Sequence, residues 1–329
     1  MKHHRKPILA LVLAALMLVS FAAPALAAPH GVTVITAVAG TEAQSFSFLA
    51  SGDPQLGAGN LESDRAGWLG SLASATQAWT DLAFLVTAGD QVNTNKNEAQ
   101  LEAFFAPVAE IGLPLAPTPG NHDPDILEGL GVPNMDRGGN YWYTYGDALF
   151  LHLNSNYTVG SFTRAFCFLW GAARANRDAS WRIAAYHHTF YSTSSRAVTP
   201  GLDILIQRMV YAALFGLFSV DLALTGHDHV YTRTKPMRFL RPAESGTIYL
   251  TMNSGSGSKY YDETDKEFNY VAASMQVRVP TLTKIDVTRE LLTLTTVRTD
   301  TMAVLDEFII RGLGTVVALG NASLDNSYL

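Results

Sequence analysis

Short apolar segments alternate with longer segments of helical periodicity from residue 46 onward. Five apolar segments are three to five residues long, as expected for strands buried on both faces of a parallel sheet; they cover residues 46–50, 83–86, 113–116, 183–185 and 220–224. Helices are predicted between them, because apolar side chains recur every three or four positions at Trp68, Leu72, Ala75 and Trp79, and again at Leu101, Phe104, Phe105 and Val108.

The remaining pattern completes a mixed α/β architecture. Residues 141–145 and 148–154 flank Gly146-Asp147 and indicate a hairpin, and helices are expected over residues 166–176 and 202–218. Strands are then expected over residues 247–252, 275–279, 281–287, 291–298 and 307–311. Strand-helix units followed by strands favour two mixed sheets packed face to face with helices outside, which is a four-layer α/β/β/α sandwich.

The first 27 residues have the pattern of a secretory signal peptide. Three basic residues precede an uncharged, almost wholly apolar run over residues 8–21, and the Ala-Leu-Ala of residues 25–27 offers a cleavage site. A membrane anchor is the alternative, but it needs about 20 apolar residues, and Pro24 interrupts the sequence soon after the run. We expect a secreted or periplasmic protein that is cleaved near Ala27 and has no stable membrane anchor.

The rest of the chain shows no linker or repeat that would divide it. We expect an N-terminal extension (28–44), one domain (45–311) and a C-terminal tail without a clear pattern (312–329). Without the three basic residues of the leader, 20 basic and 29 acidic side chains remain, a formal net charge of −9. An acidic chain disfavours a nucleic-acid backbone as partner. The single cysteine, Cys167, excludes an internal disulfide and a thiolate metal cluster. No feature indicates an oligomeric state.

Polar residues with metal-binding chemistry follow each of the five apolar segments. They are Asp53 and Gln55, then Asp90, then Asn121, His122 and Asp123, then His187 and His188, and finally His227 and His229. Residues just past the carboxyl ends of parallel strands converge on one crevice. Five of the nine histidines lie in these loops. The pattern therefore predicts a site for two metal ions.

Each loop also has an interpretation without a metal. Asp53 and Asp90 stand in Ser-Gly-Asp-Pro and Gly-Asp sequences that are common in turns, residues 120–123 can form an Asx-turn, and residues 226–229 can be a surface loop. Adjacent residues at a strand end point in opposite directions. Only one of His187 and His188 should therefore bind a metal, and the other is free to pack or to face a substrate.

Taken together, the five segments in this order resemble the calcineurin-like metallophosphoesterase superfamily, and in particular a bacterial branch related to purple acid phosphatases. The resemblance covers residues 45–311. It is closest at Gly-Asn-Leu-Glu-Ser-Asp (59–64), Gly-Asp-Gln-Val (89–92) and Gly-His-Asp-His-Val-Tyr-Thr-Arg (226–233). It implies the metallo-dependent phosphatase fold and a centre of two transition-metal ions drawn from iron, manganese and zinc.

The resemblance also implies the role of each site residue. One metal would be held by Asp53, Gln55, Asp90 and His229, and the other by Asp90, Asn121, His187 and His227, with Asp90 bridging them. His187 is preferred to His188 because it begins the His-x-x-x-Tyr stretch that ends at Tyr191. His122 would protonate the leaving group and be oriented by Asp123. His188, Tyr231 and Arg233 are candidate substrate contacts, although Tyr231 and Arg233 can equally be supporting or packing residues.

Three positions depart from the family pattern. Asn93 replaces the tyrosine that gives purple acid phosphatases their colour, so purple colour is not expected. Gln55 stands where many members have histidine, which exchanges an imidazole for a weaker neutral oxygen ligand. Thr189 replaces a proline that commonly follows the two adjacent histidines, a change expected to affect loop rigidity rather than metal ligation.

The resemblance implies hydrolysis of small-molecule phosphomonoesters by attack of a metal-bound hydroxide. Two alternatives stay open: a phosphodiesterase with the same site, and a secreted protein that binds metal or phosphate without turnover. The presence of His122 separates catalysis from binding, because binding alone does not require it. A zinc peptidase is disfavoured, since the chain contains no His-Glu-x-x-His sequence.

Overall fold

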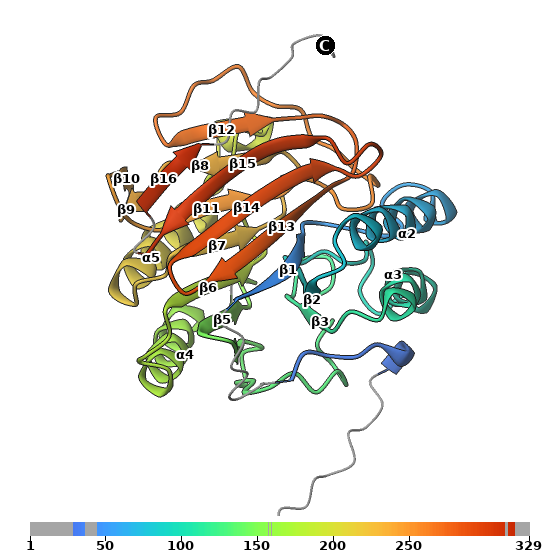
Figure 1. The fold of residues 1–329 in the computed structure, drawn as a ribbon, viewed down its shortest axis with the longest axis horizontal. Helices are drawn as coiled ribbons and strands as arrows, with labels where there is room; N and C mark the ends of the chain where they lie inside the picture. The colour runs from blue at the N-terminus through green and yellow to red at the C-terminus, as the bar shows by residue number, and fades with distance from the viewer. Residues whose placement is uncertain (1–28, 37–44, 157, 159, 313–314, 320–329) are drawn as a thin grey trace, which may run out of the picture.

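The computed structural model describes residues 29–36, 45–156, 158, 160–312 and 315–319 (Figure 1). The predicted signal peptide and its cleavage site lie outside these residues. Across the described part of the chain, no helix is both long and apolar enough to span a bilayer.

Two seven-stranded sheets form the centre of the fold. The first consists, in spatial order, of β16 (Thr315–Leu319), β15 (Val304–Arg311), β14 (Leu291–Arg298), β13 (Thr281–Thr288), β1 (Ser45–Ser51), β2 (Leu82–Thr87) and β3 (Leu115–Pro117). The second consists of β12 (Val271–Met275), β8 (Tyr231–Thr234), β11 (Ile248–Thr251), β7 (Leu222–Thr225), β6 (Trp181–Tyr186), β5 (Ala148–Leu153) and β4 (Tyr141–Tyr145). A short ribbon of β9 (Met237–Arg238) and β10 (Arg241–Pro242) stands apart.

Both sheets are mixed. In the first, β1, β2 and β3 are parallel and β13 joins β1 in the antiparallel sense. In the second, β5, β6, β7 and β11 are parallel. The predicted α/β/β/α sandwich of two mixed sheets is therefore confirmed.

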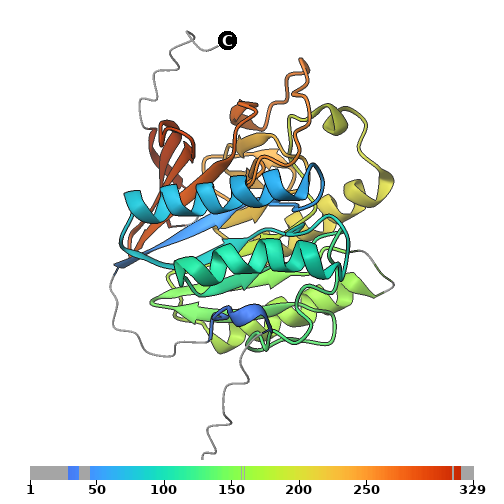
Figure 2. The same cartoon turned by 90° about the vertical axis from the view of Figure 1, so that its right-hand side faces the viewer.

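Helices lie against both sheets, although no helix stands in front of β14 and β15 of the first sheet in Figure 1 (Figures 1 and 2). Helix α2 (Leu61–Ala78) and helix α3 (Glu98–Ile111) run side by side beside the first sheet, where the Trp68 indole donates a hydrogen bond to the Phe104 carbonyl at 3.1 Å. Helix α4 (Ser161–Ala175) and helix α5 (Leu202–Leu217) lie beside the second sheet. Short 3-10 turns are η1 (Pro29–Gly31) and η2 (Ser195–Val198).

Aromatic rings fill the space between the sheets. Phe48 of β1 stacks on Phe84 of β2 with ring centroids 5.1 Å apart, and Phe150 of β5 meets both rings edge to face at 5.2 Å. Leu149 and Leu151, on either side of Phe150 in β5, point to the opposite face of the sheet and join the core beneath α4 and α5. This alternation explains why β5 is apolar at nearly every position.

Most of the predicted elements are present, and the differences have local causes. Helix α4 begins five residues earlier than expected, directly after Gly160, whose left-handed φ of 83° ends the preceding loop. Strand β12 covers Val271–Met275 rather than 275–279, and Arg278, which has a left-handed φ of 48°, lies outside it. The sequence analysis missed β8, which follows the last histidine loop directly.

Both flanks of the predicted domain pack against it. In the N-terminal extension, Val32 and Ile35 are buried, and the Ile35 amide donates to the Leu115 carbonyl of β3 at 2.9 Å. In the segment treated as a tail, β16 pairs with β15 as the edge of the first sheet. The packed unit therefore extends beyond residues 45–311 on both sides.

The buried His152 on β5 gives the fold a predicted sensitivity to acid. Its Nδ1 lies 2.8 Å from the Thr118 hydroxyl, its ring stacks on Tyr141, and burial lowers the pKa of His152 from 6.5 to about 3. Because the unfolded chain takes up this proton below pH 6.5 and the folded chain does not, His152 should reduce stability by about 1.4 kcal/mol for each pH unit between 6.5 and 3.

Urea unfolding of the metal-free chain and of His152→Phe between pH 7 and pH 4.5 checks this. The difference between the two free energies of unfolding should be constant above pH 6.5 and shift in favour of the variant below it. A difference that stays constant over the whole range would contradict the prediction.

Candidate metal centre

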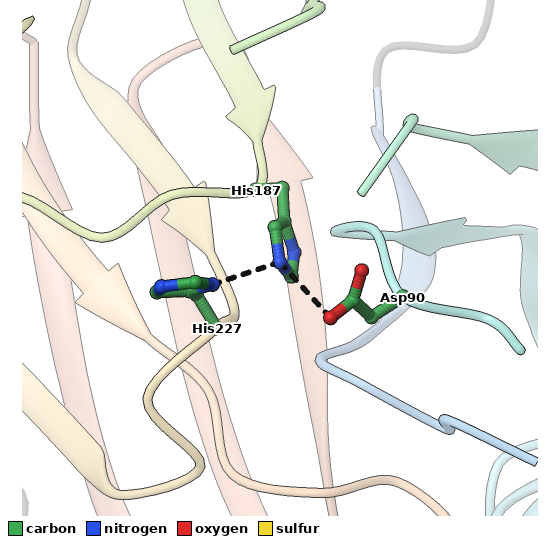
Figure 3. Close-up of side chains that lie close together, drawn as sticks. All are labelled: Asp90, His187 and His227. Atoms are coloured by element: carbon green, nitrogen blue, oxygen red, sulfur yellow. Dashed lines mark hydrogen bonds and ion pairs between the residues drawn. The ribbon is translucent and has the colours of Figure 1, made fainter. Parts of the chain in front are cut away.

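Side chains from five loops meet where the carboxyl ends of the parallel strands of both sheets come together. The first sheet supplies Asp53 and Gln55 after β1, Asp90 after β2 and Asn121 after β3, and the second supplies His187 after β6 and His227 and His229 after β7. Asp90, His187 and His227 form the tightest group, with ligand atoms all within 4.8 Å of one another (Figure 3).

Three acceptor oxygens and a ring nitrogen of a second histidine converge around His187. Its Nδ1 lies 3.0 Å from the Ala88 carbonyl and donates to it, which leaves the lone pair on Nε2. That Nε2 lies 3.0 Å from the Asn121 Oδ1, 3.2 Å from the Asp90 Oδ2 and 3.1 Å from the His227 Nδ1. A backbone carbonyl that fixes one ring nitrogen so that the other faces a cluster of lone pairs is the usual arrangement of a histidine metal ligand.

A second convergence lies around Asp53. The His229 Nδ1 donates to the Lys259 carbonyl at 2.8 Å, which leaves its Nε2 lone pair 3.3 Å from the Asp53 Oδ1. The Gln55 side chain donates through Nε2 to the Asn93 Oδ1 at 3.2 Å, and its Oε1 is buried without a hydrogen-bond partner. An unpartnered amide oxygen and an imidazole lone pair facing a carboxylate fit a cation.

The charges of the site point the same way. Asp53, Asp90 and His187 are almost completely buried. Burial disfavours the charged forms, but the attraction between Asp90 and His187 outweighs it, raising the pKa of His187 to about 9 and lowering that of Asp90 to about 2. In the metal-free chain a proton on His187 therefore compensates the carboxylates. A metal ion can take the place of that proton.

The backbone of the site is strained at five of the seven expected ligands. Residues with a φ between 27° and 74° are Asp53, Gln55, Asp90, His227 and His229. Each such conformation costs a non-glycine residue on the order of 1–3 kcal/mol, and such residues cluster at functional sites. The strain aims these side chains inward.

Two motif glycines make room for ligand carboxylates. A Cβ added to Gly120 would lie 2.1 Å from the Asp90 Oδ1, and one added to Gly226 would lie 2.2 Å from the Asp53 Oδ2. The Asp53 carboxylate in turn accepts the His227 amide at 2.8 and 3.0 Å. The glycines of Gly-Asn-His-Asp and Gly-His-Asp-His are therefore required by the close approach of a carboxylate.

Asp123 does not orient His122, so that part of the expectation is wrong. Its carboxylate accepts the backbone amides of Gly120 at 2.8 Å, Gln91 at 2.6 Å and Val92 at 3.2 Å. Burial and the charge of Asp90 raise the pKa of Asp123 to about 7. Asp123 thus ties the loop after β3 to the loop after β2, because both run past its buried carboxylate.

The His122 imidazole is positioned by Asn93 instead. Its Nδ1 lies 2.7 Å from the Asn93 carbonyl, and its backbone amide donates to the Asp90 Oδ1 at 2.8 Å. Asn93, at the position of the colour-giving tyrosine, therefore contacts both His122 and Gln55. His122 lies beside the ligand cluster, and neither of its ring nitrogens belongs to the cluster.

Asp306 engages both Tyr231 and Arg233, which favours the alternative that they are supporting or packing residues. The Tyr231 hydroxyl donates to the Asp306 Oδ2 at 2.7 Å, and Arg233 pairs with both oxygens of the same carboxylate at 2.6 and 3.2 Å. All three side chains are buried. They join β8 to β15 and so brace the two sheets against each other.

His188 and Thr189 follow His187 in the loop after β6. The His188 Nδ1 lies 2.9 Å from the Ser155 hydroxyl, and its ring centroid is 4.8 Å from that of His227, so it borders the cluster. The Thr189 hydroxyl lies 2.6 Å from that of Thr251 and takes no part in the cluster.

The sequence analysis missed Arg196 of η2. Its guanidinium lies 3.0 Å from the His227 Nε2, donates to the His227 carbonyl at 3.3 Å and stands 3.7 Å from the Asp228 Oδ1. No spacing rule indicates it, because Arg196 lies in an irregular loop about 30 residues before the histidine that it contacts.

Gly226→Ala should damage the centre. The added methyl must displace the Asp53 carboxylate, because the two would lie 2.2 Å apart, and we expect at least a tenfold loss of Zn²⁺ affinity. Gly216→Ala in α5 is the matched control, since nothing lies within 4 Å of its added Cβ, and it should bind Zn²⁺ like the wild type. Competition with a chromogenic chelator measures both affinities. Wild-type affinity in Gly226→Ala would contradict the placement of Asp53.

Comparison with solved structures supports the fold. A purple acid phosphatase from yellow lupin (Lupinus luteus) seeds has a TM-score of 0.66 at 19% identity, covering 81% of this chain and 54% of that chain. GAP50 of Plasmodium, described as the anchor in the inner membrane complex, has a TM-score of 0.61 at 14% identity, covering 83% of this chain and 90% of that one. PhoD has a TM-score of 0.59 at 12% identity, covering 88% and 73%. Similarity at these identities concerns the fold alone.

Comparison at the level of sequence identifies the family. An uncharacterized protein of Mycobacterium tuberculosis is 24% identical over 44% of this chain, a match that spans 36% of that protein's length. The chain thus matches just over a third of the curated relative. The model of the calcineurin-like phosphoesterase family matches residues 46–231. That match covers more than half of the chain and contains the loops that form the centre, so the chain belongs to the calcineurin-like phosphoesterase family.

Proposed function

We propose that this chain is a metal-dependent phosphomonoesterase with a centre of two transition-metal ions, drawn from iron, manganese and zinc, that acts outside the cytoplasm. The observation that carries the proposal is the convergence of metal-binding side chains around two buried carboxylates. The Nε2 atoms of His187 and His229 lie beside Asp90 and Asp53, where a metal ion can replace the proton on His187, and the buried Gln55 Oε1 has no partner.

The two convergences give each ion its own set of ligands. Asp90, Asn121, His187 and His227 would hold one ion, and Asp53, Gln55, Asp90 and His229 the other. Asp90 is assigned the bridging role. Its Oδ1 is engaged by the His122 amide at 2.8 Å, so its Oδ2 faces the cluster in a fixed direction.

The chemistry follows from the charges. Cations held by these residues would neutralise a phosphoryl group and lower the pKa of a bound water, and so would supply a nucleophile near neutral pH. His122 would donate a proton from Nε2 to the departing alkoxide, because the Asn93 carbonyl holds Nδ1 at 2.7 Å and fixes the ring direction. His188, beside His227, would contact the substrate phosphate.

Three features favour a small phosphomonoester over other substrates. The expected leader would export the enzyme to where phosphate esters can be scavenged, the acidic chain disfavours nucleic acid, and the purple acid phosphatase is among the structures with the same fold. A phosphodiesterase with the same site is the alternative within the enzyme class.

Outside the enzyme class, the alternative is a protein that binds metal or phosphate without turnover. GAP50 supports this alternative, because GAP50 has the same fold and is described as an anchor. His122 separates the two functions. It lies beside the ligand cluster and contributes no ring nitrogen to it, as expected of a proton donor and not required of a binding site.

The substrate class is tested with p-nitrophenyl phosphate and bis-p-nitrophenyl phosphate. The Zn²⁺- or Mn²⁺-loaded chain should have the higher kcat/KM for the monoester at each pH tested, since a doubly charged group is attracted more strongly to two cations. A higher kcat/KM for the diester at every pH would show that the proposed substrate class is wrong, without affecting the proposed metal centre. Absence of turnover with both esters would favour the binding protein.

His122→Ala is expected to keep its metal and lose rate. The loss in kcat should be about 100-fold or more for an alkyl phosphate, whose leaving alkoxide needs a proton, and much smaller for p-nitrophenyl phosphate, whose leaving group does not. Steady-state kinetics over a series of leaving groups, with metal content measured in parallel, gives the answer. An equal loss for good and poor leaving groups would assign His122 to phosphate binding.

A further inference from the structure

A cavity of about 310 Å³ opens beside the metal centre on the side of the second sheet. Its lining includes His227, which is also part of the centre, together with Asp228, Arg196 and Arg208. The cavity lies between the loop after β6 and the start of α5. A substrate whose phosphoryl group occupies the centre can therefore extend into it.

Arg208 brings a charge to this cavity that the protein does not neutralise. Its guanidinium stacks over the Tyr191 ring at 5.1 Å, and its Nε is buried without a hydrogen-bond partner. No carboxylate within the described residues pairs with it. A buried guanidinium nitrogen without a partner is costly, because it has lost water and gained no acceptor. The residue is thus held ready for an acceptor that the chain itself does not supply.

Arg196 adds a second guanidinium on the same wall. It stacks over Tyr261 at 4.9 Å and contacts His227, so it is fixed directly between the cavity and the metal centre. The one carboxylate lining the cavity, Asp228, lies 3.7 Å from Arg196, which offsets its charge. Two guanidinium groups against one carboxylate leave the cavity with a net positive charge.

From this we infer that the cavity binds a second anionic group of the substrate, a carboxylate or a second phosphate, which Arg208 contacts directly and Arg196 supports. The inference rests on the proposed function and makes it more specific. The natural substrate would be a phosphoester that carries another anion near the scissile group. Planar guanidinium groups suit this role, because each can donate two parallel hydrogen bonds to a carboxylate or a phosphate.

Non-reactive phosphonates test the inference without catalysis. Propylphosphonate, 3-phosphonopropionate and 1,2-ethanediphosphonate differ only at the end remote from the first phosphonate, which is a methyl, a carboxylate or a second phosphonate. Calorimetric titration of the Zn²⁺-loaded full chain should show at least one of the two probes with an anionic remote end binding about tenfold more tightly than propylphosphonate. The probe that gains more identifies the anion.

The decisive variant is Arg208→Ala. The ratio between the Kd of propylphosphonate and that of the preferred probe should fall from about ten to near one, since the acceptor loses its donor. Arg174→Ala is the matched control, because Arg174 also stacks over an aromatic ring, Trp170 at 5.3 Å, but lies on α4 and outside the cavity. The ratio of the two Kd values in Arg174→Ala should equal that of the wild type.

The outcomes separate this inference from the proposed function. If propylphosphonate binds but the second anion gives no gain, or if the gain survives in Arg208→Ala, the cavity does not serve as an anion subsite and the phosphoesterase proposal stands. A gain lost equally in Arg174→Ala would reflect overall charge and would also overturn the inference. If no phosphonate binds the metal-loaded chain, the proposed function fails, and the anion subsite fails with it.

Discussion

Asp53 and Asp90 place two buried carboxylates in the centre, and nitrogen and oxygen atoms of other side chains surround both. Desolvation of a carboxylate costs several kcal/mol unless a cation or hydrogen-bond donors compensate it. The site supplies few donors: the His227 amide reaches Asp53, and the His122 amide reaches Asp90. The ring nitrogens of His187 and His229 lie 3.0 to 3.3 Å from amide and carboxylate oxygens, where a proton on His187, or a metal ion in its place, compensates the carboxylates. Positive charge is therefore required to compensate the buried carboxylates, and the surrounding residues are arranged to hold it.

The site needs both sheets, because neither sheet alone supplies a complete set of ligands. Carboxylates and amides come from the loops of the first sheet, and imidazoles come from the loops of the second. The hydrogen bonds from His227 to Asp53 and the contact of His187 with Asp90 cross between them. The aromatic packing of Phe48, Phe84 and Phe150 fixes the spacing of the sheets, so the ligands are positioned before any ion binds. His122 and Arg196, which we propose for proton transfer and substrate recognition, border this centre, and Arg208 lines the cavity beside it.

The sequence predicted the parts that depend on local pattern. Apolar runs located the buried strands, and the strand ends located the ligand loops, because side chains there must converge. Roles that depend on distant partners could not be predicted. Tyr231 and Arg233 follow the histidine loop closely, but Asp306, more than 70 residues later, turns them inward. Asp123 adjoins His122 in sequence, but three backbone amides use its carboxylate. Arg196 and Arg208 lie in segments whose pattern says nothing about the cavity that they share.

The central claim is that two cations are held and that Asp90 serves both. Calorimetric titration of the metal-free chain with Zn²⁺ tests it directly, with Asp90→Asn as the variant, since asparagine tolerates the φ of 49° at this position and removes only the charge. The account predicts two equivalents bound by the wild type and loss of both high-affinity sites in the variant. A wild-type stoichiometry of one, or a variant that retains both sites, would contradict it.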